Sequence, residues 1–187
     1  MENPVSKPEI RRRMRLLRRS MSQQERARVS AAICAKLLAD PATAHADVTV
    51  AVYIASQEEI DLSPFIREML SRGSTVAAPR WNGMTYDLAK VRELSAENLR
   101  PGPMGILEPR EADLVTPEDV DLWIVPGLAF TADGKRVGYG GGWYDRLLSA
   151  SSAGSLKVGV ACGFQIVDDI PADAHDIQVD RVVTDAS

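Results

Sequence analysis

The segment best suited to chemistry is residues 126–146, where six of the chain's 13 glycines lie beside Arg136 and Asp145. Glycine lets the backbone turn its N–H groups toward one point and lets an anion approach closely. Arg136 offers a planar donor pair for phosphate, and Asp145 stands where it can hold Mg²⁺ against that phosphate. The start of the helix expected over 143–148 adds free N–H groups and a positive dipole end. The segment therefore predicts a site for the phosphates of a nucleotide.

Neither common phosphate-binding fingerprint fits this segment. The Walker A loop ends in Gly-Lys followed by Ser or Thr, and no Lys-Ser or Lys-Thr pair occurs here. The dinucleotide pattern G-x-G-x-x-G, counted from Gly138, fails because Trp143 stands in place of the third glycine. A glycine-rich turn that only caps a helix stays open as the alternative interpretation.

A second candidate site is the acidic loop Gln57–Asp61, which directly follows the apolar run 48–55. In open parallel sheets, ligands bind beyond the carboxyl ends of the strands, and the glycine-rich segment also follows a predicted strand. We therefore expect both segments at one edge of the sheet, where a carboxylate can bind an amine-rich heterocycle. A solvated acidic loop is the alternative.

The N-terminus is strongly basic. Residues 1–36 hold ten Lys and Arg against three acidic residues, a net charge of +7, whereas residues 37–187 carry −11. The helix expected over 7–19 is basic nearly all round, and Lys7 and Arg11 share one of its faces. Such an arm could bind nucleic acid, an anionic membrane or a phosphate ligand, or it could dock on the acidic body.

Acidic residues also gather between Asp168 and Asp180. One of them could be a second metal ligand, although composition alone favours a solvated surface. The two histidines, His45 and His175, are too few and too isolated to support a metal triad or a Ser-His-Asp triad.

Helix signals recur along the chain. Ser22 and Glu25 have the spacing of a capping box, and Ser63-Pro64 resembles an N-cap followed by a first-turn proline. Four helices are expected, over 7–19, from 22 to Pro41, over 63–73 and over 143–148. The first has an apolar stripe of Ile10, Met14 and Leu17, and in the second Val29, Ile33 and Leu37 face the core.

Apolar, β-branched runs predict the strands 48–55, 74–78, 122–125, 156–161 and 181–184. One short helix between the first two strands makes a βαβ unit, and so a parallel pair. The pattern predicts an α/β fold with three layers (α/β/α), a mostly parallel sheet and helices on both faces, in a single domain over 1–187. Residues 82–119 are broken by prolines and give no readable pattern.

Composition excludes several classes of protein. With 187 residues, 45% of them hydrophobic and 26% charged, the chain has globular rather than disordered composition. Cys34 and Cys162 form no C-x-x-C pair, which disfavours a disulfide framework or a zinc knuckle. No apolar run reaches the roughly 18 residues of a membrane helix, and the N-terminus lacks the apolar core of a secretory signal. We expect a cytoplasmic protein.

These residues resemble the 5-formyltetrahydrofolate cyclo-ligase family, whose hallmark is similar to V-P-G-L-x-F-x-x-x-G-x-R-L-G-x-G-x-G-x-Y-D-R. Residues 125–146 follow that pattern with three departures. Val137 replaces the usual Leu, Trp143 the usual Tyr or Phe, and Thr131 the common Asp. Further matches, in the family's order, are Lys7 with Arg11, Tyr53–Asp61, Gly105–Pro109 and His175–Asp180. The resemblance spans the whole chain.

The resemblance implies an ATP- and Mg²⁺-dependent closure of 5-formyltetrahydrofolate to 5,10-methenyltetrahydrofolate, with release of ADP and phosphate. Lys7 and Arg11 would hold ATP phosphates. The nucleotide would be wrapped by Arg136, Val137, Gly138, Tyr139, Gly140, Gly141, Gly142, Trp143 and Tyr144. Folate would meet Ile54, Glu59, Tyr139, Gly140, Gly141, Gly142 and Trp143. Asp145 and Asp176 would coordinate Mg²⁺, and Arg136, Tyr144 and Asp145 would be catalytic.

On this interpretation the partners are small molecules, neither nucleic acid nor a membrane, and the chain is expected to be a monomer whose basic arm docks at the nucleotide site. Two other classes stay open. A sugar-phosphate isomerase or CoA-transferase relative would need no ATP and could use Glu58, Glu59 or Glu108 as a catalytic carboxylate. An RNA-binding module would use the basic arm and show steep salt dependence. The segment 82–119 is expected to cover the site, with Trp81 and Met104 nearby.

Overall fold

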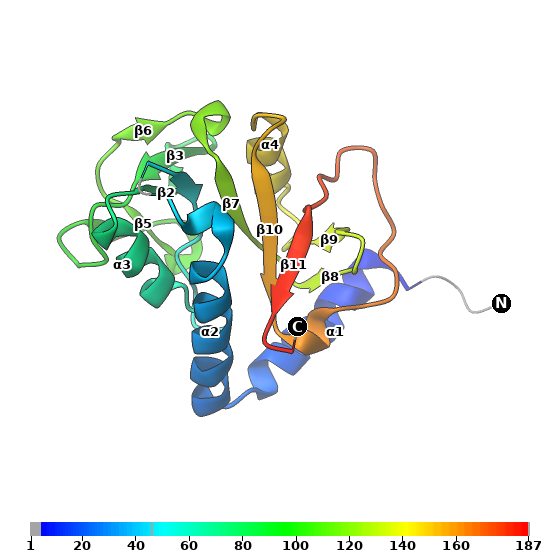
Figure 1. The fold of residues 1–187 in the computed structure, drawn as a ribbon. Helices are drawn as coiled ribbons and strands as arrows, with labels where there is room; N and C mark the ends of the chain where they lie inside the picture. The colour runs from blue at the N-terminus through cyan, green and yellow to red at the C-terminus, as the bar shows by residue number, and fades with distance from the viewer. Residues whose placement is uncertain (1–4, 46, 187) are drawn as a thin grey trace.

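The computed structural model describes residues 5–45 and 47–186 (Figure 1). Its helices are α1 (Lys7–Ser20), α2 (Gln23–Leu38), α3 (Ser63–Ser71) and α4 (Trp143–Ser149). Its strands are β1 (Thr49–Ala51), β2 (Thr75–Trp81), β3 (Tyr86–Lys90), β4 (Leu99–Pro101), β5 (Leu107–Pro109), β6 (Leu114–Val115), β7 (Leu122–Pro126), β8 (Ala129–Phe130), β9 (Arg136–Val137), β10 (Leu156–Ala161) and β11 (Arg181–Thr184). Short 3-10 turns lie at Pro41–Thr43, Pro103–Gly105, Pro117–Asp119 and Gly163–Gln165.

Within these described residues, a seven-stranded sheet has the order β11-β10-β7-β1-β2-β3-β6. The strands from β11 to β2 are parallel, β3 pairs antiparallel with β2, and the edge strand β6 pairs antiparallel with β3. Val50 of β1 packs with α2 and α3 on one face, whereas the next residue, Ala51, packs with α4 on the other. This alternation gives helices on both faces of a mainly parallel sheet, so the predicted three-layer fold is confirmed (Figure 1).

The helix α1 lies apart from the main sheet, across the β8–β9 ribbon (Figure 1). Its predicted bounds are confirmed to within one residue, and Ile10 and Met14 are buried against Leu128 and Val137. The third member of its buried face is Arg18 rather than Leu17, which is 36% exposed. The prediction that Leu17 completes the stripe was wrong because the spacing of four from Ile10 through Met14 continues to position 18.

Two local predictions need correction, and a third is confirmed in part. The strand expected over 48–55 contains only Thr49–Ala51, because after Val52 donates to the Ala77 carbonyl the chain leaves the sheet. Helix α3 begins at Ser63, so Leu62 rather than Ser63 occupies the N-cap position, and the Asp61 carboxylate accepts from the Ser63 amide. At α2, the Ser22 hydroxyl accepts from the Glu25 amide, which confirms half of the capping box.

The segment 82–119 holds real structure despite its prolines. Asn82 and Gly83 turn the chain from β2 into β3, with Gly83 at a φ of +105°, and the Asn82 amide donates to the Thr85 carbonyl. The strands β4 and β5 then form a separate hairpin. Asn-Gly between two strands is a strong hairpin signal, and here it marks the addition of β3 to the sheet.

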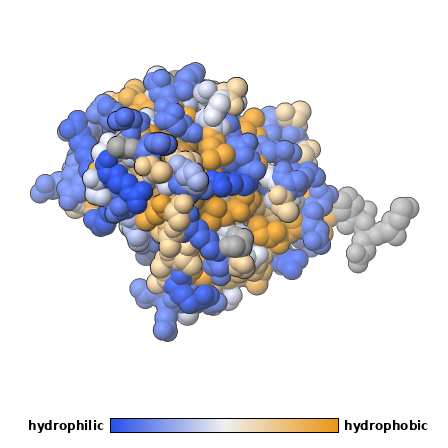
Figure 2. Space-filling model, viewed as in Figure 1, coloured by the Kyte–Doolittle hydropathy of each residue, from blue (hydrophilic) through white to orange (hydrophobic). Residues whose placement is uncertain are grey.

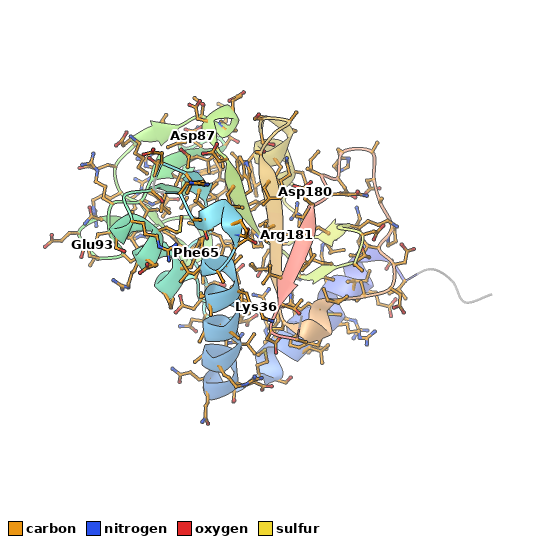
Figure 3. The ribbon with its side chains drawn as sticks, viewed as in Figure 1. Lys36, Phe65, Asp87, Glu93, Asp180 and Arg181 are labelled. Carbon is orange, nitrogen blue, oxygen red and sulfur yellow. The ribbon has the colours of Figure 1, made fainter. Side chains whose placement is uncertain are left out.

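Side chains tie α2 to the edge strand β11. Lys36 donates to the Thr184 carbonyl at 2.8 Å, and Arg181 forms an ion pair with Asp40 just beyond the helix (Figure 3). Figure 2 shows hydrophilic residues around the rim of this face and apolar residues gathered in its middle. No helix among the described residues has both the length and the apolar character to cross a bilayer.

Candidate active site

A cavity of about 510 Å³ lies beyond the carboxyl ends of β1, β2 and β7. Its walls come from α1, the loop after β1, the hairpin β4–β5, the glycine-rich segment and the C-terminal segment before β11. It therefore sits where open parallel sheets bind ligands. Every residue that the sequence singled out for nucleotide, folate or metal binding lines it: Lys7, Arg11, Ile54, Glu59, the continuous run Arg136–Asp145, and Asp176.

The glycine-rich segment forms the ribbon β8–β9, an open loop and the start of α4. Gly140 and Gly142 have φ values of +107° and +64°, which only glycine adopts at little cost. The Arg11 side chain donates to the Gly138 carbonyl at 2.9 Å. Arg11 of α1 therefore contacts the backbone of this glycine-rich loop directly.

A buried ion pair joins β9 to α4. Arg136 donates to the Asp145 carboxylate at 2.6 Å, and the two side chains are 4% and 19% exposed. The amide of Ile177 also donates to Asp145. The Arg136 Nε is buried and has no hydrogen-bond partner among the described residues. Because Arg136 lines the cavity, its guanidinium can also bind an anionic ligand there.

Lys7 forms a second charged cluster with the C-terminal segment. Its ammonium group donates to Asp173 at 2.6 Å and to Asp176 at 2.5 Å. Burial lowers the pKa of Lys7, but the two carboxylates outweigh it and raise the pKa overall. Burial likewise raises the pKa of Asp176, but the Asp173 amide and Lys7 outweigh it, so the pKa lies below its usual value. Both groups are therefore charged at neutral pH.

His175 is less isolated than the sequence indicated. One ligand atom each of Asp173, His175 and Asp176 lies within 4.8 Å of the others. This group lies on the same wall as Lys7, and Ile177, the residue after Asp176, donates to Asp145. The two predicted metal ligands, Asp145 and Asp176, are therefore linked through the Ile177 amide. Each also forms an ion pair, Asp145 with Arg136 and Asp176 with Lys7.

Glu59 is buried in the opposite wall, 9% exposed. One carboxylate oxygen accepts from the Tyr139 hydroxyl at 2.9 Å and the other from the Ser56 amide at 2.9 Å. Burial raises the pKa of Tyr139, the Glu59 charge raises it further, and Arg18 opposes both. Burial also raises the pKa of Tyr144, whose hydroxyl has no partner among the described residues. Both tyrosines stay protonated at neutral pH and can donate hydrogen bonds.

Aromatic rings form a third part of the wall. Trp81, Tyr86 and Trp143 pack edge to face, with ring centroids 5.1 to 5.4 Å apart. The Arg146 guanidinium covers Trp143 at 4.1 Å from its ring centroid. Tyr86 and Trp143 line the cavity, so they offer aromatic ring surface against which a heteroaromatic ligand can pack.

Comparison with known proteins matches this arrangement to one family. The sequence model of the 5-formyltetrahydrofolate cyclo-ligase family matches residues 3–185. The chain belongs to this family. The predicted relationship, and with it membership of a family of ligases, is confirmed.

Relatives of the cyclo-ligase family resemble the chain over nearly its full length. The mouse 5-formyltetrahydrofolate cyclo-ligase is 28% identical over 180 residues, covering 90% of this chain and 88% of the relative. The solved 5,10-methenyltetrahydrofolate synthetase of Aquifex aeolicus is 38% identical with a TM-score of 0.84, covering 97% of this chain and 90% of that one. That of Mycoplasma pneumoniae, 24% identical with a TM-score of 0.77, shares the fold and covers 96% and 98%.

The carboxylates of the rival isomerase interpretation lie differently. Glu58 is not among the cavity-lining residues and pairs with Arg19 at 3.0 Å. Glu108 lines the cavity, but its side chain is 4% exposed and both oxygens are occupied, by Arg100 and by the Trp81 amide. Neither is placed as a free catalytic base. Glu59 also lines the cavity, but its two partners are the neutral donors Tyr139 and the Ser56 amide, whereas Glu108 forms an ion pair with Arg100.

Several cavity residues were missed from the sequence. Tyr53 and Ser56 lie in the wall because the chain leaves the sheet earlier than its apolar run indicates. Tyr86 belongs to β3, which the Asn-Gly turn could have revealed. Asp173 had no distinguishing signal among the C-terminal acids. Met104, expected near the site, lines the cavity, whereas Trp81 lies behind the lining residues Tyr86 and Trp143.

Proposed function

We propose that this chain uses ATP and Mg²⁺ to close 5-formyltetrahydrofolate to 5,10-methenyltetrahydrofolate, releasing ADP and phosphate. The observation that carries the proposal is a single cavity with cations and carboxylates on one wall and a buried carboxylate with aromatic rings on another. The first wall suits a metal-bound triphosphate, and the second suits a pterin. Because all these groups come from one chain, we also propose that it acts as a monomer.

The reaction needs phosphate transfer because an N-formyl group is an amide and its oxygen is a poor leaving group. The formyl oxygen attacks the γ-phosphorus, and the bond from that phosphorus to ADP breaks. N10 then attacks the carbon of the resulting iminium phosphate. Phosphate departs with the former formyl oxygen, and N10 loses its proton to leave the methenyl cation. Such transfer depends mainly on positioning and charge neutralisation, which fits a cavity without an obvious nucleophile.

On the nucleotide wall, Lys7, Arg11 and Arg136 would bind the phosphates. Lys7 and Arg136 each hold a carboxylate, Asp176 and Asp145 respectively, that is a proposed metal ligand. Carboxylate oxygens are the donors that Mg²⁺ prefers, so the residues present fit the ion. When bound, Mg²⁺ would neutralise charge on the phosphates. The cations and carboxylates would then exchange partners, the cations to phosphate and the carboxylates to metal.

On the folate wall, Glu59 would accept hydrogen bonds from the amino and ring N–H groups of the pterin, beside the apolar side chain of Ile54. The hydroxyl of Tyr144 is buried, has no hydrogen-bond partner within residues 5–45 and 47–186, and lies close enough to Glu59 and Arg136 for both charges to affect its pKa. That free donor would stabilise the oxygen on which negative charge develops.

We expect Glu59→Gln to raise the KM for 5-formyltetrahydrofolate about tenfold or more, the cost of a hydrogen bond to a charged group. A glutamine amide also turns its NH₂ toward a donor, either the Tyr139 hydroxyl or the Ser56 amide. Glu58→Gln is the matched control because that neighbouring carboxylate is exposed and pairs with Arg19. Steady-state kinetics check both variants, and equal KM values in the two would contradict the assignment of Glu59.

We expect Lys7→Met to raise the KM for ATP about tenfold at saturating Mg²⁺ and saturating folate. The variant removes a phosphate-binding cation and also leaves Asp173 and Asp176 without it. Arg12→Gln is the control, since Arg12 lies on the same helix, is 70% exposed and makes only a 3.9 Å pair with Glu9. An unchanged ATP requirement in Lys7→Met would remove Lys7 from the nucleotide site.

The experiment that tests the proposed function is the near-ultraviolet absorbance of purified protein mixed with 5-formyltetrahydrofolate, ATP and Mg²⁺. The methenyl chromophore should grow only in the complete mixture. Each component is then omitted in turn. Growth without ATP would favour an ATP-independent enzyme, and a flat trace from folded protein that binds ATP would point to another acceptor.

A further inference from the structure

Arg18 is a buried cation on the inner face of α1, 4% exposed, and it does not line the cavity. Arginine is costly to bury unless its donors are all used. Two of its nitrogens donate to residues on different segments, of which Tyr139 lines the cavity and Glu58 is the neighbour of the lining residue Glu59. Its Nε donates to the Glu58 carbonyl at 2.7 Å, and its Nη1 donates to the Tyr139 hydroxyl at 2.8 Å. The guanidinium thus connects the acidic loop to the glycine-rich loop from behind.

The direction of these hydrogen bonds fixes the proton of Tyr139. A guanidinium has only donors, so the Tyr139 oxygen accepts from Arg18. Its own proton is then left for Glu59, whose carboxylate lies 2.9 Å away. With the Ser56 amide on the second oxygen, Glu59 is held at both oxygens by donors. These two donors hold the Glu59 carboxylate in one orientation, with its remaining lone pairs directed toward the cavity.

We propose that Arg18 is a positioning residue for the folate substrate, acting through Tyr139 on the Glu59 carboxylate. The inference rests on the proposed function in one respect, that Glu59 binds the pterin. Arg18 touches no reacting group and contributes only by fixing the donor that orients Glu59. The effect is expected on folate binding and not on ATP binding, since the phosphate-binding cations on the other wall do not contact Arg18.

A second arginine, Arg26, also supports the acidic loop, so the effect of Arg18 on Tyr139 can be separated from support of that loop. Arg26 also donates to the Glu58 carbonyl, at 2.8 Å, and to the Arg18 carbonyl, at 2.8 Å. These two hydrogen bonds from Arg26 go to backbone oxygens, so they remain when the Arg18 side chain is replaced. What Arg18 adds to these bonds is therefore its hydrogen bond to the Tyr139 hydroxyl.

The test combines Arg18→Gln, Tyr139→Phe and the double variant, with Arg13→Gln as a control that removes a charge from the exposed side of the same helix. Each single variant should raise the KM for 5-formyltetrahydrofolate about tenfold and weaken folate binding measured by tryptophan fluorescence without ATP, and Arg18→Gln should leave the KM for ATP within twofold. The double variant should be no worse than the worse single variant, because both act through one hydroxyl. Arg18→Lys, which keeps one donor, should recover part of the loss.

Additive effects in the double variant, or equal increases in both KM values, would overturn the proposal in favour of a general structural role. If Arg18→Gln does not fold, Tyr139→Phe and Arg18→Lys carry the same comparison. Wild-type protein that binds no folate would instead contradict the proposed function. Wild-type binding with unchanged affinity in the variants would contradict the role of Arg18 alone.

Discussion

Replacing Arg136 with alanine is expected to lower kcat/KM about a hundredfold and to destabilise the protein by about 3 kcal/mol. The arginine is the buried partner of Asp145 at 2.6 Å and also faces the cavity. Breaking a buried ion pair costs about 3–5 kcal/mol because the remaining charge is uncompensated. The lower end applies here, since the Ile177 amide still donates to Asp145 and that carboxylate is 19% exposed.

The loss of activity has a separate cause from the loss of stability. A hydrogen bond to a charged phosphate contributes about 1.5–3 kcal/mol, equivalent to roughly ten- to a hundredfold in rate. Lys135→Ala is the control because it removes the neighbouring positive charge, whose ion pair with Asp169 is at the surface. Kinetics at a temperature well below unfolding separate the two effects. Activity within twofold of wild type in folded Arg136→Ala would remove Arg136 from the mechanism.

Replacing Gly134 with alanine is expected to lower the free energy of unfolding by about 3 kcal/mol or more, equivalent to a drop in Tm of roughly 10 °C. Gly134 has a φ of +91°, and a Cβ there would collide with the Val179 carbonyl oxygen. The Gly134 carbonyl also accepts from the Val179 amide at 2.9 Å. This contact anchors the C-terminal segment that supplies Asp173 and Asp176, so ATP binding should weaken as well.

Gly154→Ala is the matched control for that variant. Gly154 has an ordinary backbone conformation, and a Cβ there would meet only the Ser152 hydroxyl at 3.9 Å. Thermal unfolding of the two variants beside wild type makes the comparison. A Gly134→Ala protein as stable as Gly154→Ala would show that the C-terminal segment can shift without cost.

Most of the fold could be predicted because its strands are buried on both faces and read as continuous apolar runs. The same property caused the error at 48–55, since Tyr53 and Ile54 continue the apolar run but line the cavity and do not belong to the sheet. Apolar composition does not distinguish those two environments. The strand β3 was missed because its five residues, Tyr86–Lys90, form no continuous apolar run, although Asn82-Gly83 was a usable signal.

The candidate site could be predicted as a set of residues but not as a network. The family resemblance placed Lys7, Glu59 and Asp176 on one site, and all three line one cavity. The pairing of Arg136 with Asp145 joins residues nine positions apart and depends on the turn into α4. The contact from Arg18 to Tyr139 spans 121 positions. No sequence pattern specifies a side-chain hydrogen bond over that separation.

The central claim is that ATP drives ring closure by phosphorylating the formyl oxygen. The most direct measurement uses 5-formyltetrahydrofolate labelled with heavy oxygen in its formyl group, MgATP, and mass spectrometry of the phosphate released. The account predicts that the heavy oxygen appears in phosphate, in an amount equal to the methenyl product formed. Methenyl product accompanied by unlabelled phosphate would contradict it.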